Sequence, residues 1–246
     1  MKKFRLPKSF QQATRDEAIN NSIYQSLKSV FEHTADFKEL KFTKGDRSFI
    51  FCFLETLVSK ENFNEYLLVP LFEHGSNVSR ESLKSLDGME NPEYKELIEG
   101  ILDGGYVLFL CGSNESWLFK YPKSNQRAIQ EPQNENVVRG AHDGFIENLE
   151  VNISLLRQKI KDPDFTVKYH VLGEKTRTKL AVVFIRGIAD EEVVAEVERR
   201  LSYISTDMVI SPGYIEEFIE DDPFSLFPQI INTERPDRTM ANLMEG

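Results

Sequence analysis

Two stretches of the chain repeat one pattern: a strand, a charged turn with a glycine, a second strand of apolar residues, and a helix that begins with acidic residues. The first is FKELKFTKGDRSFIFCFLETLVSKENFNEYL and the second is DFTVKYHVLGEKTRTKLAVVFIRGIADEEVVAEV. Farther along each half, NPEYKELIEG and SPGYIEEFIE keep Pro, Tyr and Glu in register. Because paired strands need a covering layer, the pattern predicts an α/β (α+β-like) fold of two small mixed α/β subdomains. The second subdomain is either a degenerate repeat of the first or a separate unit of the same class.

A polar stretch, KSNQRAIQEPQNENVVRGAHDG, separates the two halves. Its content of Asn, Gln, Gly and charge is typical of a linker. We place the boundary in its middle, so that a polar linker and the helix after it join the subdomains. The predicted domains are 1–34, an N-terminal arm and helix; 35–128, the first subdomain; and 129–246, the second. With 246 residues, 40% of them hydrophobic, the chain can fill two small cores.

Hydrophobic periodicity defines the elements of the first half. Pro70 should break or end any helix over 60–73, because proline lacks an N–H and clashes with the preceding turn. Asn91 should be the N-cap of a helix whose first residue is Pro92. The expected elements are a helix over 16–33, strands over 37–42 and 48–58, a loop over 75–82, a helix over 91–102, and a hairpin of YVLFLCG and SWLFKYP.

The strongest helical pattern in the chain lies at 145–160, where apolar residues recur at spacings of four, four, three and four. Asp143 or Gly144 can cap this helix. Asn148 and Asn152 would share one face of it. Because Asn is a poor helix former, their amides either hold a neighbouring loop or belong to a solvated face.

The rest of the second half continues the alternation of strands and helices. The expected elements are a strand over 164–171, a buried strand over 179–188, a helix capped by Asp190 and a helix over 211–221. The helix after Asp190 should turn four side chains inward: Val193, Val194, Val197 and Leu201.

The charge balance narrows the choice of partners. Forty acidic residues face thirty basic ones, a formal net charge of -10, which argues against nucleic acid and against anionic lipid over most of the surface. The start, MKKFRLPKSFQQ, is the basic exception. It is either a solvated arm or a segment that contacts a membrane surface. No apolar run approaches the ~18–20 residues that span a bilayer.

No catalytic or metal motif is present in the sequence. A G-x-S-x-G elbow, a Walker loop and a G-x-G-x-x-G turn are all missing, and the four His are isolated. Cys52 and Cys111 sit in apolar strand-like runs, so we expect two buried thiols in a reducing compartment. We therefore predict a protein that is not an enzyme, with no catalytic residues, no metal site and no cofactor.

Four motifs carry a resemblance to a known family: E-P-x-x-E-x-V-x-R-G from Glu131, F-x-E-N-L-x-x-N-I from Phe145, F-P-Q from Phe227, and T-E-R-P-D from Thr233. In this order they resemble the GerA-type germinant receptor A subunits of spore-forming Firmicutes. The match is strong over about 130–246 and weaker over 37–122. Ala141 departs from the family, which usually has proline after R-G.

The resemblance implies a role. In that family a large hydrophilic N-terminal domain precedes several membrane spans, and the A subunit works with a membrane-embedded B subunit and a lipoprotein C subunit. The chain would then be such an N-terminal domain on the core side of the spore inner membrane, ending in a juxtamembrane hinge. Its partners would be the B and C subunits, other A subunits and weakly bound nutrients. No residue is predicted to bind a ligand.

The interaction candidates are polar residues in three places: the linker, the helix that follows it and the last segment of the chain. They are Glu131, Pro132, Arg139, Gly140, Asp143, Gly144, Glu147, Asn148, Asn152, Thr233, Glu234, Arg235, Pro236 and Asp237. In the first hypothesis these residues serve receptor assembly and signal transmission, with an Arg–carboxylate pair fixing the hinge. In the second, the domain is a module that binds the nutrient between or within its subdomains.

Overall fold

A computed structural model describes residues 22–44, 47–73, 78–121, 143–209, 211–222, 225 and 227–246. The chain divides into two compact units. The first unit is Met1–Gln126 with Lys161–Pro163, and the second is Arg127–Ile160 with Asp164–Gly246. The basic N-terminal stretch and the start of the helix expected over 16–33 lie outside the described residues. So do most of the linker and its candidates Glu131, Pro132, Arg139 and Gly140.

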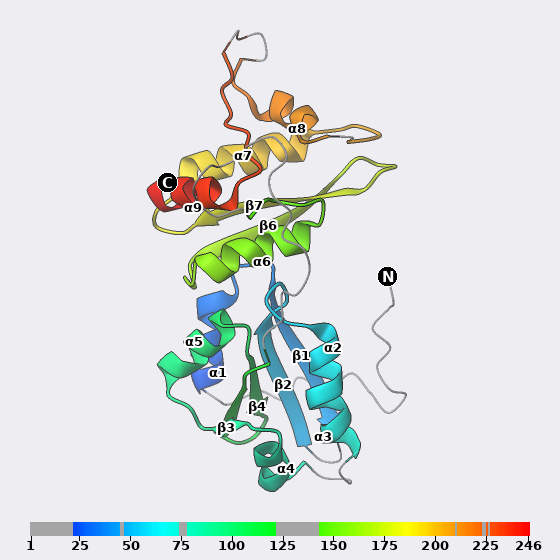
Figure 1. The fold of residues 1–246 in the computed structure, drawn as a ribbon, viewed down its shortest axis with the longest axis vertical. Coiled ribbons are helices and arrows are strands. Elements are labelled where there is room, and N and C mark those ends of the chain that lie inside the picture. The colour runs from blue at the N-terminus through cyan, green and yellow to red at the C-terminus, as the bar shows by residue number, and fades with distance from the viewer. Residues whose placement is uncertain are drawn as a thin grey trace. The chain divides into compact units, whose positions relative to one another are not determined.

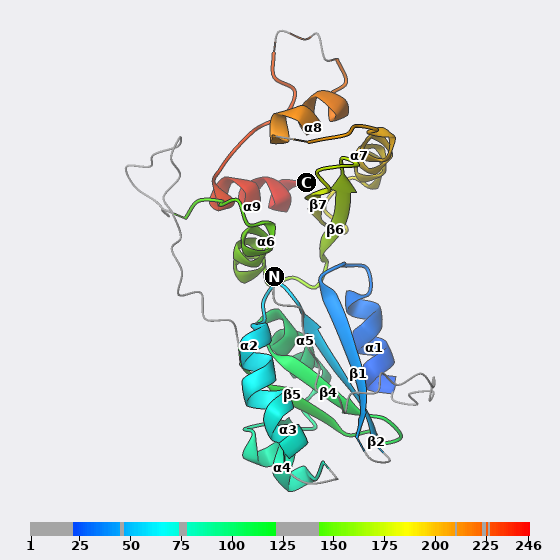
Figure 2. The same cartoon turned by 90° about the vertical axis from the view of Figure 1, so that its right-hand side faces the viewer.

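The first unit is built on a five-stranded antiparallel sheet of strand order β1-β2-β4-β5-β3. Figure 1 labels β1 to β4, and Figure 2 labels β5. The strands are β1 (Phe37–Lys44), β2 (Arg47–Leu54), β3 (Met89–Glu90), β4 (Tyr106–Leu110) and β5 (Ser116–Phe119). The hairpin expected from YVLFLCG and SWLFKYP is confirmed as β4 and β5.

Helices cover both faces of this sheet. One face packs against α1 (Ser22–Phe31) and α5 (Tyr94–Leu102). The other packs against the π-helix η1 (Phe63–Leu68), which continues from α2 (Lys60–Asn62), and against α3 (Val69–Glu73) and α4 (Arg80–Ser85). Successive residues of a strand point to opposite faces, so the apolar run of β2 fills both cores. Cys52 is fully buried there, whereas Cys111, expected to be buried too, is only partly buried just after β4.

Pro70 does not end the helix, contrary to the prediction. The helical stretch continues from η1 into α3, with the N–H of Val69 bonded to the carbonyl of Asn64, five residues back. A π-turn is wider than an α-turn, which gives the proline ring room that a regular helix lacks. The sequence shows the proline but not the π-turn before it.

Two further helix starts differ from the prediction. The expected loop over 75–82 contains the start of α4, which Ser79 caps through a reciprocal bond with Ser82. Asn91 is not the N-cap of α5, because its φ of 47° places it in the left-handed region. It exchanges hydrogen bonds with Ser116 instead, and Glu93 caps the helix.

The second unit has a two-stranded antiparallel sheet between two pairs of helices (Figure 2). The strands are β6 (Phe165–Leu172) and β7 (Thr178–Ile185). One face packs against α6 (Leu149–Lys159) and α9 (Pro236–Glu245), the other against α7 (Glu191–Tyr203) and α8 (Pro212–Ile219).

The residues of this two-stranded sheet are less buried than the sequence indicates. β7 was expected to be a buried strand, yet most of its residues are only half-buried, because two strands are too narrow to be fully enclosed. The helix capped by Asp190 is confirmed as α7, and Leu201 turns inward as expected. Val193 does not, since its side chain is 60% exposed.

The two units share the strand–turn–strand–helix order as far as α2 and α7. In each, the paired strands have eight residues in full antiparallel register. After this the units differ: the first adds β3, β4 and β5, whereas the described part of the second adds no third strand. Duplication of one ancestral unit stays a prediction.

Candidate functional site

Two segments that the sequence singles out lie together in the second unit. The backbone N–H of Phe145, before α6, donates to the carbonyl of Glu234, before α9, at 2.7 Å. We call residues 143–152 and 233–243 together the α6–α9 junction. It joins the beginnings of two helices that are distant in the sequence.

Asparagines set the beginning of α6. Asn148 is its N-cap, and its side-chain oxygen accepts from the N–H of Val151 at 3.2 Å. Asn152 accepts from the N–H of Ile146 at 2.9 Å and donates to the carbonyl of the same residue at 2.6 Å. Of the two hypotheses for these amides, the one in which an amide holds a neighbouring loop is therefore confirmed for Asn152.

The predicted caps of α6 are wrong. The helix begins at Leu149, four residues later than the hydrophobic spacing indicates, so Asp143 and Gly144 lie too far upstream to cap it. Asp143 instead pairs with Lys159 near the end of the helix, at 3.1 Å. Gly144 is buried and Glu147 is exposed.

Arg235 and Asp237 shape the beginning of α9. Arg235 is the N-cap residue, in an extended conformation, and buried Pro236 is the first helical residue. The guanidinium holds the carboxylate of Asp237 through two bonds, Nε to Oδ1 at 3.1 Å and Nη2 to Oδ2 at 2.5 Å. This pairing lowers the pKa of Asp237 below its ordinary value. The N–H of Arg235 also donates to the hydroxyl of Thr233 at 3.2 Å.

The anticipated Arg–carboxylate pair is therefore local. It stiffens the turn into α9. The helix is held by apolar contacts: Met240 and Leu243 pack on the core formed by α6, β6 and β7, beside Phe145 and Leu149. The beginnings of α6 and α9 are thus joined by one backbone hydrogen bond and by a shared apolar core.

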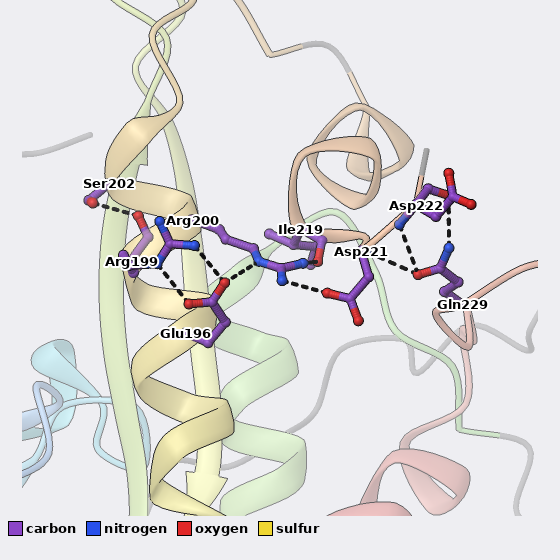
Figure 3. A network of polar contacts seen from close by, with 8 residues as sticks. All are labelled: Glu196, Arg199, Arg200, Ser202, Ile219, Asp221, Asp222 and Gln229. Carbon is purple, nitrogen blue, oxygen red and sulfur yellow. Dashed lines mark hydrogen bonds and ion pairs between the residues drawn. The ribbon is translucent and has the colours of Figure 1, made fainter. Parts of the chain in front are cut away.

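A second polar arrangement links α7 to α8 (Figure 3). The carboxylate of Glu196 accepts two bonds from Arg199, at 2.6 and 2.7 Å, and one from Arg200, at 2.7 Å. Arg200 also donates to the carbonyl of Ile219 at 2.6 Å and to Asp221 at 2.5 Å. The two guanidinium groups lower the pKa of Glu196 to about 2.

Gln229 binds the backbone of the two residues Asp221 and Asp222, which follow α8. Its side-chain oxygen accepts from the N–H groups of Asp221 and Asp222, and its amide donates to the carbonyl of Asp222 at 2.8 Å. An open cavity of about 390 Å³ lies beside this network, with Val193 and Val197 of α7 among its walls. No sequence pattern singles out this network, because basic residues in the last turn of a helix have an ordinary explanation in the helix dipole.

Comparison with known proteins identifies the family. The model of the Bacillus/Clostridium GerA spore germination proteins matches residues 25–246. The chain belongs to the GerA family. The membrane protein YfkQ of Bacillus subtilis is 31% identical over 244 residues, which cover 94% of this chain and 47% of that protein. Spore germination protein B1 of B. subtilis is 32% identical over 240 residues, 94% of this chain and 50% of that protein.

The fold of this GerA-family chain is also that of a solved structure. The N-terminal domain of the A subunit of the Bacillus megaterium spore germinant receptor GerK3 superposes with a TM-score of 0.65, at 24% identity. The match covers 91% of this chain and 86% of that domain.

The chain spans about half the length of the GerA-family relatives it matches. Within the ranges that the structure describes, no helix is both long and apolar enough to cross a membrane. In those ranges there is also no cluster of His, Cys, Asp and Glu that could hold a metal ion.

Proposed function

We propose that the chain is the N-terminal domain of the A subunit of a nutrient germinant receptor. In this role it takes part in receptor assembly and transmits the signal that triggers spore germination. Family membership and the fold shared with the GerK3 domain support the proposal. The observation that carries the transmission role is the hydrogen bond from Phe145 to Glu234, because it couples the beginnings of α6 and α9.

The proposal includes partners and a location. The full-length protein would work in the spore inner membrane, with this domain on the core side. It would contact the membrane-embedded B subunit, the lipoprotein C subunit and other A subunits. Within the junction, exposed Glu147 and the acidic first turn of α9, with Asp237, offer polar contacts.

Charge removal at the beginning of α9 tests the transmission role. Spores would carry the full-length protein with Arg235→Ala or with Asp237→Ala. Each change removes one side of the bidentate pair and loosens the turn into α9. We expect slower release of dipicolinate after nutrient addition, at unchanged receptor abundance on immunoblots.

Lys175→Ala is the matched control. Lys175 pairs with Asp207 at 2.8 Å, in the same unit but away from the junction, and both side chains are well exposed. This variant should germinate like the wild type. Normal germination of both junction variants, with abundance and folding intact, would exclude the role given to Arg235 and Asp237.

A second candidate function is a module that binds the nutrient itself. The cavity of about 390 Å³ beside α7 and α8 favours it, because apolar Val197 and Ile219 meet the polar groups of Arg200 and Gln229 there. NMR titration of the chain with nutrients separates the two functions. Saturable shifts at these four residues support binding, and unchanged spectra at millimolar nutrient support transmission alone.

A further inference from the structure

A separate cavity, of about 220 Å³, opens in the first unit, on the sheet face that η1 covers. Its interior is apolar and largely aromatic. The interior is lined by Leu40, Phe53, Val58, Phe63 and Tyr106. None of these residues belongs to the α6–α9 junction or to the network of α7 and α8.

Three aromatic rings form the wall of this cavity. Phe63 stacks on Tyr106 with centroids 4.6 Å apart, and Phe53 lies 5.3 Å from Tyr106. The hydroxyl of Tyr106 is already engaged, since it donates to the carbonyl of Ser59 at 2.9 Å. The wall therefore presents ring carbons to an occupant. Phe63 is also the first residue of η1, and π-turns in helices are frequent at functional sites.

The rim of the cavity has one more positive than negative charge. Lys38, Lys60 and Glu55 line it. Lys60 is paired with Glu55 at 2.6 Å. Lys38 stands on the edge strand β1, directly opposite Phe53 on β2, and donates to the carbonyl of Ala35 at 2.8 Å. An ammonium group has three donors, so Lys38 can also bind an anion at the end of the aromatic wall.

The size of the cavity limits the occupant. A dry apolar cavity of about 150 Å³ is sufficient to hold benzene. A cavity of about 220 Å³ has room for one ring or a branched chain with a short tail. We propose that this cavity binds a small apolar monocarboxylate, with its body against Phe53, Phe63 and Tyr106 and its carboxylate at Lys38.

The proposal does not depend on the receptor role and can be tested on the 246-residue chain. The probes are 3-phenylpropionate and 3-phenylpropan-1-ol, which share the ring and chain length but differ in charge. Methyl NMR signals of Leu40 and Val58 should shift saturably with the acid. Because the alcohol lacks the negative charge that pairs with the exposed ammonium group of Lys38, it should bind about two- to fivefold more weakly.

Two lysine variants give a matched comparison. Lys38→Gln should remove the preference for the acid over the alcohol. Lys41→Gln removes the same charge from the same strand, but its partner Ile50 packs on the opposite face of the sheet. This control should keep the preference. Leu40→Phe should fill the cavity and abolish the binding of both probes.

Three results would overturn the proposal. The first is the absence of saturable shifts at Leu40 and Val58 with either probe. The second is equal affinity for acid and alcohol in the wild type. The third is an equal effect of Lys38→Gln and Lys41→Gln, which would mean that only the net charge of the domain matters.

Discussion

Asn152 holds Ile146 with both halves of its side-chain amide, accepting from the N–H at 2.9 Å and donating to the carbonyl at 2.6 Å. An amide thus reaches back from the first turn of α6 and satisfies one donor and one acceptor of the loop before the helix. No charge is involved, so the clamp is insensitive to pH and salt. It fixes the loop whose next residue upstream, Phe145, contacts the segment before α9.

Asn152→Ala should therefore loosen this loop. Each lost hydrogen bond contributes about 0.5–1.5 kcal/mol, so the free energy of unfolding of the second unit should fall by about 1–3 kcal/mol. Hydrogen exchange at the amide of Ile146 should speed up accordingly. Asn242→Ala, at an exposed position of α9, is the control and should leave that exchange rate unchanged.

The pairing of Glu196 with two arginines predicts that the stability of the fold decreases at acidic pH. Its pKa is lowered in the fold from the ordinary 4.5 to about 2, so it stabilises the fold fully above pH 4.5. This stabilisation is lost as the pH falls from about 4.5 towards 2. The thermal midpoint of the wild type should fall more steeply over that window than that of Glu196→Gln. If the thermal midpoints of the wild type and Glu196→Gln fell in parallel with pH, the prediction would be contradicted. Glu217→Gln, on the exposed side of α8, is the control for the loss of one carboxylate.

Gly105 precedes β4 at a position with no space for a side chain. A Cβ there would lie 2.7 Å from the carbonyl oxygen of Gly100 and 2.9 Å from that of Phe119. Gly105→Ala must therefore displace the backbone. We expect the free energy of unfolding of the first unit to fall by about 1–3 kcal/mol. Trp117, the single tryptophan, is buried in this unit, so its fluorescence reports the change directly.

Gly213→Ala provides the contrast. A Cβ at that position meets nothing within 4 Å, and the residue lies in α8 of the second unit. The urea midpoint followed by Trp117 should not move. Equal effects of the two glycine variants on that midpoint would show that steric crowding at Gly105 is not the cause.

Arg157 is a charged side chain in the core of the second unit. It is fully buried, and its guanidinium lies 4.6 Å from the centre of the ring of Phe165. Arg157→Ala leaves a cavity and removes the cation–π contact. The free energy of unfolding of the second unit should therefore fall by about 2–5 kcal/mol. Amide exchange along β6 should then accelerate. Unchanged exchange there would contradict this packing role.

The class of fold follows from local patterns. Alternation and apolar runs predict the β1–β2 and β6–β7 hairpins, and acidic starts with helical spacing predict α7. Local backbone conformation decides the details that were missed. Asn91 and Asn148 are both plausible caps by residue type, but only Asn148 has the extended conformation that a cap requires. A π-turn before Pro70 likewise has no recognised signature in residue types.

The sequence motifs single out the segments around Asn152 and Arg235, whose role in a functional site stays a prediction. The contact of these segments through Phe145 and Glu234 joins positions far apart in the sequence, so no local pattern indicates it. The partners of a buried polar side chain cannot be read from the sequence for the same reason. Asp36 is fully buried and accepts hydrogen bonds from Thr34 and from Thr56, which lies 20 positions away. Such partners emerge only from the folded chain.

In the second unit, α9 covers only one of the two cores that lie on opposite faces of the two-stranded sheet. Alternate residues of β7 belong to two different cores, with Val183 on the side of α6 and α9 and Val182 on the side of α7 and α8. If α9 detached, the hairpin would stay anchored through the second core. Met240 and Leu243 alone would lose roughly 3–6 kcal/mol of apolar burial, close to the ~5.5 kcal/mol that inverts a 99:1 equilibrium. Detachment of α9 would therefore leave the core between the hairpin, α7 and α8 in place.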